Sequence, residues 1–161
     1  MTAGAPLLHL EDLAPGQRFE GLGRHALDKA QILAYARQFD PQPFHLDPEA
    51  AQDTLFNGLA ASGWHTAALT MRLMVDGGVP LAWGLIGAQA EVRWPTPTRP
   101  GDVLRVESEV LEVRPSRSKP DRGLVKVRTL TLNQRAEVLQ ELVATMVVPR
   151  RTAEAGPDAA D

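Results

Sequence analysis

The spacing of apolar residues changes from helical in the first half of the chain to alternating in the second. Asp28 is a good helix N-cap. The apolar residues that follow it are spaced so that they share one side of a helix, which predicts a helix over about 29–38; they are Ile32, Leu33, Ala36 and Phe39. A longer stripe between the N-cap candidate Ser62 and the Gly77-Gly78 pair predicts a second helix, buried on most sides; its members are Trp64, Ala67, Ala68, Met71, Met74 and Val75.

The second half of the chain is typical of β-strands. In 84–94 the apolar residues alternate with polar ones, which predicts a strand with one buried face. Similar runs predict strands over 103–113, 124–132 and 138–148, and a short strand is expected over 17–25. A run of strands after the helices favours an α+β fold, in which an antiparallel sheet wraps around the long helix.

The 161 residues suit one domain. Residues 1–16 are expected to form a lead-in that ends in the turn Ala14-Pro15-Gly16, and 17–149 to form the domain. The segment 150–161, rich in alanine, glycine, proline and aspartate, is expected to be a disordered tail.

Composition excludes several classes of function. The formal net charge of −3 provides no broad basic field for nucleic acid or an anionic membrane. The absence of cysteine excludes disulfides, thiolate metal sites and cysteine nucleophiles. The N-terminus lacks the pattern of a signal peptide, and no stretch approaches the ~18 apolar residues of a membrane span. We therefore expect a cytoplasmic protein.

Candidate chemistry first appears in the loop that follows the first predicted helix. Asp40 and His45 stand five residues apart with Pro41 and Pro43 between them, and two prolines in three residues indicate a stiff, ordered loop. Such a loop can hold a carboxylate and an imidazole around one water for proton transfer. The alternative is a solvated turn. After it, Asp47-Pro48 predicts the start of a short helix towards Phe56.

A second candidate is the start of the long helix at Ser62-Gly63. The first amides of a helix have no partner within it and carry partial positive charge. Glycine lets a ligand approach that backbone closely, which suits a thioester oxygen that gains charge in a transition state. The alternative is that Ser62 only caps the helix and that Gly63 only aids packing.

Three segments together resemble the MaoC-like dehydratases and (R)-specific enoyl-CoA hydratases of the hot-dog fold. They are FDPQPFHLDPEAA, ASGWHTAALTMRLM and RWPTPTRPGD. The resemblance implies a helix wrapped by an antiparallel sheet, in a homodimer or a dimer of dimers. It implies Asp40 and His45 as the catalytic pair and the amide of Gly63 as the oxyanion hole. It also implies an acyl-CoA substrate and no metal or redox cofactor, with coenzyme A present as part of the substrate.

Two positions depart from the family pattern. Gln42 stands where the family usually has asparagine, and Ser62 stands where many members have histidine. Both are expected to support the site, Ser62 by capping the helix or by bonding near Asp40. These departures bear on the class of substrate more than on the type of reaction.

Weaker candidates surround this site. An acyl pocket lined by Phe44, Phe56 and Trp64 is one hypothesis, with ordinary core packing as its alternative. A second hypothesis is that basic side chains contact the phosphates of coenzyme A, and its alternative is that they form a solvated face. The candidates are Arg93, Arg114, Lys119 and Arg122. We expect His65 to be a packing residue. A hot-dog thioesterase and a non-catalytic acyl-binding subunit stay open as other functions, as do the acyl group and a carrier-protein thioester.

Overall fold

The structure, a computed structural model, describes residues 6–151. Its helical elements are the 3-10 turn η1 (Leu10–Asp12) and the helices α1 (Lys29–Phe39), α2 (Pro43–Leu46) and α3 (Gly63–Gly77). Its strands are β1 (Arg18–Glu20), β2 (His25–Ala26), β3 (Gly87–Arg93), β4 (Val103–Pro115), β5 (Arg122–Leu132) and β6 (Val138–Pro149).

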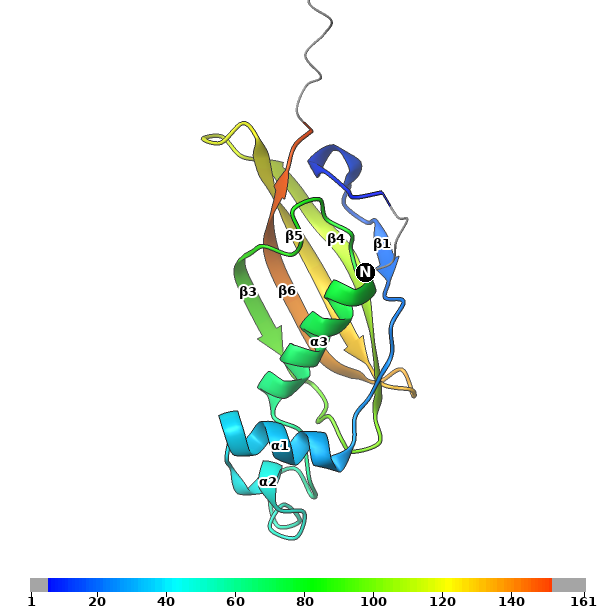
Figure 1. The fold of residues 1–161 in the computed structure, drawn as a ribbon, viewed down its shortest axis with the longest axis vertical. Helices are drawn as coiled ribbons and strands as arrows, with labels where there is room; N and C mark the ends of the chain where they lie inside the picture. Colours follow the sequence, from blue (N-terminus) through cyan, green and yellow to red (C-terminus); the bar gives the residue numbers. More distant parts are fainter. Residues whose placement is uncertain (1–5, 152–161) are drawn as a thin grey trace, which may run out of the picture.

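The strands form one antiparallel sheet that curves around α3 (Figure 1). The order is β1-β4-β5-β6-β3, and β2 adds to the start of β4. Along β4, alternate residues are buried from Leu104 to Val110, as expected for a strand with one face in the core. Leu104, Val106 and Val110 share a core with Leu73 and Met74 of α3. The predicted α+β fold, an antiparallel sheet wrapped around a long helix, is confirmed.

The sheet does not cover the side of α3 that its apolar stripe predicts. The buried face carries Leu73 and Met74 together with the hydroxyl groups of Thr66 and Thr70, which have polar partners there, and of the predicted stripe it includes Met74 alone among the described residues. Trp64, Met71 and Val75 are 60, 45 and 57% exposed, so the expected burial on most sides is wrong for the single chain. A stripe identifies the apolar side of a helix, but here the helix meets the sheet with the neighbouring side.

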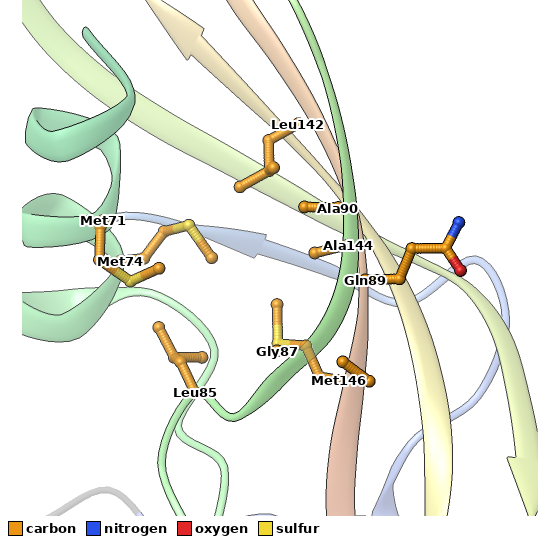
Figure 2. Close-up of a pocket in the computed structure, with 10 residues that line it drawn as sticks. Met71, Met74, Leu85, Gly87, Gln89, Ala90, Leu142, Ala144 and Met146 are labelled. Atoms are coloured by element: carbon orange, nitrogen blue, oxygen red, sulfur yellow. The ribbon is translucent and has the colours of Figure 1, made fainter. Parts of the chain in front are cut away.

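An apolar groove therefore lies open between α3 and the edge of the sheet. Figure 2 shows Met71 and Met74 of α3 across from Leu142 of β6 and Ala90 of β3. The groove encloses about 280 Å³. Within residues 6–151, strand β3 pairs with β6 alone, and it is exposed at every residue except Val92. The buried face predicted for 84–94 is thus open within the single chain.

Three predicted elements before α3 differ from the structure. The strand expected over 17–25 is interrupted, because the chain leaves β4 at Leu22, whose N–H binds the carbonyl of Gly77 instead. The loop expected at Pro43 is a one-turn helix, α2, since proline is tolerated at the first helical position. The short helix expected after Asp47 is a series of turns.

The ends of the described chain lie close together. Arg150 and Arg151 form ion pairs with Glu11 and Asp12 in η1. The rest of the tail expected to be disordered, and the first five residues of the lead-in, lie outside the described residues. Between residues 6 and 151, no helix is long and apolar enough to cross a membrane.

Candidate active site

Asp40 is held at the end of α1 by contacts from three directions. It is the C-cap of the helix, and its N–H donates to the carbonyl of Ala36. The hydroxyl of Ser62 donates to Oδ2 at 2.7 Å, and the side-chain amide of Gln42 donates to Oδ1 at 2.6 Å. Partial burial raises the pKa of Asp40, but the hydrogen bonds from Ser62 and Gln42, with the charge of His45, lower it overall.

His45 is buried in α2, and its ring is oriented by the backbone. Nδ1 lies 2.7 Å from the carbonyl oxygen of Ala60, which can only accept a hydrogen bond. Nδ1 therefore carries the proton, and in the neutral ring Nε2 is an unprotonated acceptor. Nε2 lies 3.4 Å from Oδ2 of Asp40. Both residues line one cavity, where a single water can hydrogen-bond to both atoms.

The start of α3 forms the opposite side of the site. Within the described chain, the Gly63 N–H has no hydrogen-bond acceptor. Ser62 uses its hydroxyl on Asp40 and makes no side-chain cap, which agrees with one of its two expected roles. The indole of Trp94 packs directly on Gly63, where an added Cβ would lie 2.7 Å from ring carbon Cε2. No larger residue fits between the helix and this ring.

One cavity of about 600 Å³ joins Asp40, His45 and Gly63. Apolar side chains form most of its wall, and the hydroxyls of Thr66 and Thr98, 2.9 Å apart, add a polar strip. Of the predicted acyl-pocket residues, Phe56 and Trp64 line the cavity. Phe44 does not line it and instead packs on His45 and Phe56. Further lining residues are Leu55, Ala61, Trp94, Pro95, Thr96 and Pro97.

A buried hydrogen-bond network fixes the indole wall of this cavity. Nε1 of Trp94 donates to Oε1 of Gln140 at 2.8 Å, and the amide of Gln140 donates to Thr70 at 3.0 Å. The Thr70 hydroxyl also lies 2.6 Å from that of Thr131. In the sequence, Trp94 is the last apolar residue of the alternating run 84–94 and part of the family resemblance, and Gln140 carries no signal of its own. Nothing in the local pattern distinguishes this glutamine from other polar strand residues.

None of the residues suggested for coenzyme A phosphates lines the cavity in the described chain. Arg114, Lys119 and Arg122 belong to the β4–β5 hairpin, at the opposite end of the sheet from α1 and α2 (Figure 1). The 13 residues of β4 separate the two ends by roughly 40 Å. Arg93 ends β3 and pairs with Glu91. Their contact with a substrate stays a prediction.

The histidines outside the pair contribute no metal site. His65 is buried and stacks on Tyr35 at 4.5 Å, which confirms the expected packing role. Burial, and then the charge of His25, lowers the pKa of His65. Among residues 6–151, no three His, Cys, Asp or Glu side chains are grouped to hold a metal ion.

A curved antiparallel sheet wrapped around one long helix is the arrangement of a hot-dog-fold domain. The family model described as "MaoC like domain" matches residues 12–132. The chain therefore belongs to the MaoC-like domain family of hydratases and dehydratases.

Solved structures agree with this membership. A MaoC-like dehydratase from Rhodospirillum rubrum is 60% identical, with a TM-score of 0.88 over 91% of this chain and 99% of its own. The unliganded R-hydratase PhaJ1 from Pseudomonas aeruginosa is 25% identical, with a TM-score of 0.65 over 95% of this chain and 96% of its own.

Curated relatives differ in how much they share with this chain. The Bacillus subtilis protein YdeM is 29% identical over 144 residues, 89% of this chain and all of YdeM. Mesaconyl-CoA hydratase from Cereibacter sphaeroides is 42% identical over 62 residues, which are 38% of this chain and 18% of that enzyme.

Proposed function

We propose that this protein catalyses the reversible addition of water to an enoyl thioester, with Asp40 and His45 as the catalytic pair. The observation that carries the proposal is the pair of atoms Oδ2 of Asp40 and Nε2 of His45, 3.4 Å apart at one cavity. The lowered pKa of Asp40 supports an ionised carboxylate near neutral pH. A structural ion pair would not need a cavity bounded by a free helix amide.

In the hydration direction, one water donates its hydrogens to Asp40 and His45 and directs a lone pair at Cβ of the substrate. As the oxygen bonds to Cβ, one proton passes to the pair and the electrons of the double bond move onto the thioester oxygen. The N–H of Gly63, at the positive end of α3, stabilises that charge. The pair then returns a proton to Cα on the same face, which completes a syn addition.

This acid–base chemistry requires neither a metal nor a redox cofactor. Coenzyme A enters only as part of the substrate, and the mesaconyl-CoA hydratase relative supports an acyl-CoA substrate. The aromatic residues Phe56 and Trp64 favour an apolar acyl group in the cavity.

The test replaces Asp40 with asparagine and follows enoyl absorbance with a panel of straight, branched and dicarboxylic enoyl-CoA thioesters. We expect Asp40→Asn to lower kcat/KM by about 10²–10⁴-fold, the usual range for a general base. Asp53→Asn, at an exposed turn position, is the matched control and should keep wild-type activity. Undiminished hydration by Asp40→Asn contradicts the proposal. Release of free thiol without loss of enoyl absorbance identifies a thioesterase instead, and binding without turnover identifies an acyl-binding subunit.

We also propose that the protein works as a homodimer or a dimer of dimers. The groove between α3 and β3 is apolar, and the free edge of β3 can pair with another strand (Figure 2). Exposed Met71 and Val75 border the same region. Val75→Glu should shift the protein to a monomer in analytical ultracentrifugation, whereas Arg18→Glu on the opposite edge should not. A wild-type monomer contradicts this assembly.

A further inference from the structure

Arg99 makes an unusual set of contacts with the loop that precedes α3. Its Nη1 donates to the carbonyls of Gly58 at 3.0 Å and Leu59 at 3.2 Å, and its Nη2 donates to the carbonyl of Phe56. Asn57 and Gly58 both have positive φ, which reverses the chain so that these carbonyls face one side. A guanidinium has several donors in a rigid plane, so one side chain can hold them all.

Arg99 is itself fixed by the turn that follows it. Its backbone N–H donates to Oδ2 of Asp102 at 2.8 Å, and the N–H of Asp102 returns to the carbonyl of Arg99 at 3.1 Å. Asp102 is buried. The neighbouring Thr98 carbonyl accepts the N–H of Ala61 at 2.9 Å. Residues 98–102 therefore hold both ends of the loop 56–61, which precedes α3.

The loop that Arg99 holds contains the group that orients His45. Leu59 directly precedes Ala60, whose carbonyl accepts Nδ1–H of His45. Phe56, also held by Arg99, packs against the ring of His45 at 5.8 Å between centroids. Arg99 does not line the cavity. Any effect it has on the reaction must therefore pass through this loop.

We infer that Arg99 is a positioning residue that keeps the proton of neutral His45 on Nδ1, and this inference rests on the proposed hydratase function. Without the guanidinium, the carbonyls of residues 56, 58 and 59 lose their donor, while the N–H groups of Ala60 and Ala61 stay bound to the carbonyls of Phe44 and Thr98. We expect the Ala60 carbonyl to shift away from Nδ1 because the chain on its Leu59 side is no longer fixed. The ring proton is then free to move to Nε2. A protonated Nε2 donates to Asp40 and no longer accepts a proton from the attacking water.

The experiment compares Arg99→Ala and Arg99→Lys with the wild type and with Arg18→Ala, an exposed control. Nitrogen-15 NMR of the histidine rings, assigned with His45→Gln, reports the tautomer of His45 without any substrate. We expect Arg99→Ala to move the His45 proton towards Nε2 and to lower kcat by about 10²-fold, the effect of a misplaced group, with little change in KM. Added guanidinium ion should reverse both effects in part.

Arg99→Lys keeps the stem and the charge but cannot span three carbonyls, so it should show a smaller change of the same kind. If Arg99→Ala does not fold, the His45 tautomer in Arg99→Lys provides the test. An unchanged His45 tautomer in either folded variant overturns the inference. A changed tautomer, together with a wild type that hydrates no enoyl thioester, leaves the inference standing and rejects the hydratase proposal.

Discussion

Replacing Gly63 with alanine tests the contact between the start of α3 and the indole of Trp94. The added Cβ would lie 2.7, 2.9 and 3.0 Å from ring carbons Cε2, Cδ2 and Cζ2. Carbon atoms in ordinary contact are about 3.5–4.0 Å apart, so the ring or the helix start must move by roughly 0.8 Å. The ring cannot turn freely, because Nε1 is bound to Gln140.

Overpacking of this kind costs about 1–3 kcal/mol of the free energy of unfolding. The same displacement moves the proposed oxyanion donor, and a shift near 1 Å can lower the rate by about 10²-fold. Urea unfolding gives the first quantity, and kcat/KM with the best enoyl-CoA of the panel gives the second. Gly23→Ala is the matched control, since its Cβ would meet only Leu73 at 3.4 Å.

A double-mutant cycle with Trp94→Ala isolates the contact from other effects of the methyl group. Once the ring is removed, Gly63→Ala should be neutral, or stabilising by up to about 1 kcal/mol through helix propensity. The coupling between the two changes should therefore be about 1–4 kcal/mol. Equal costs of Gly63→Ala in both backgrounds would refute the proposed steric role of Trp94.

Two further predictions concern the polar groups around the site. Ser62→Ala removes a hydrogen bond that lowers the pKa of Asp40, so the acidic limb of the kcat/KM profile should move to higher pH; an unchanged limb, or one moved to lower pH, contradicts this. Because the folded pKa of Asp40 is lowered, its contribution to stability is present above the unfolded pKa and is lost as pH falls through the folded value. The difference in urea midpoint between wild type and Ser62→Ala should accordingly shrink in acid. Gln140→Leu leaves the indole N–H of Trp94 without its acceptor and should cost about 1–3 kcal/mol in urea unfolding, with a change in tryptophan fluorescence; an unaltered midpoint would show that water replaces the amide.

The chain's local patterns predicted α1, α3 and the long strands, and they singled out the segment that carries the candidate catalytic pair. Alternation in the second half identified the strands, because side chains on a strand point to opposite faces whatever covers them. The segment from Asp40 to His45 was recognisable because its prolines and its spacing are local properties. The resemblance through Gly63 and the Pro100-Gly101-Asp102 turn connected these pieces to one family.

Only the tertiary structure decided which groups meet. Ser62 reaches Asp40 across 22 positions, and Gln140 reaches Trp94 across 46, and no short-range pattern encodes such pairs. Contacts between distant positions also explain why the side of α3 that meets the sheet was predicted incorrectly. Periodicity reports which residues share a side of the helix, whereas the partners of Thr70 on two distant strands decide which side meets the sheet.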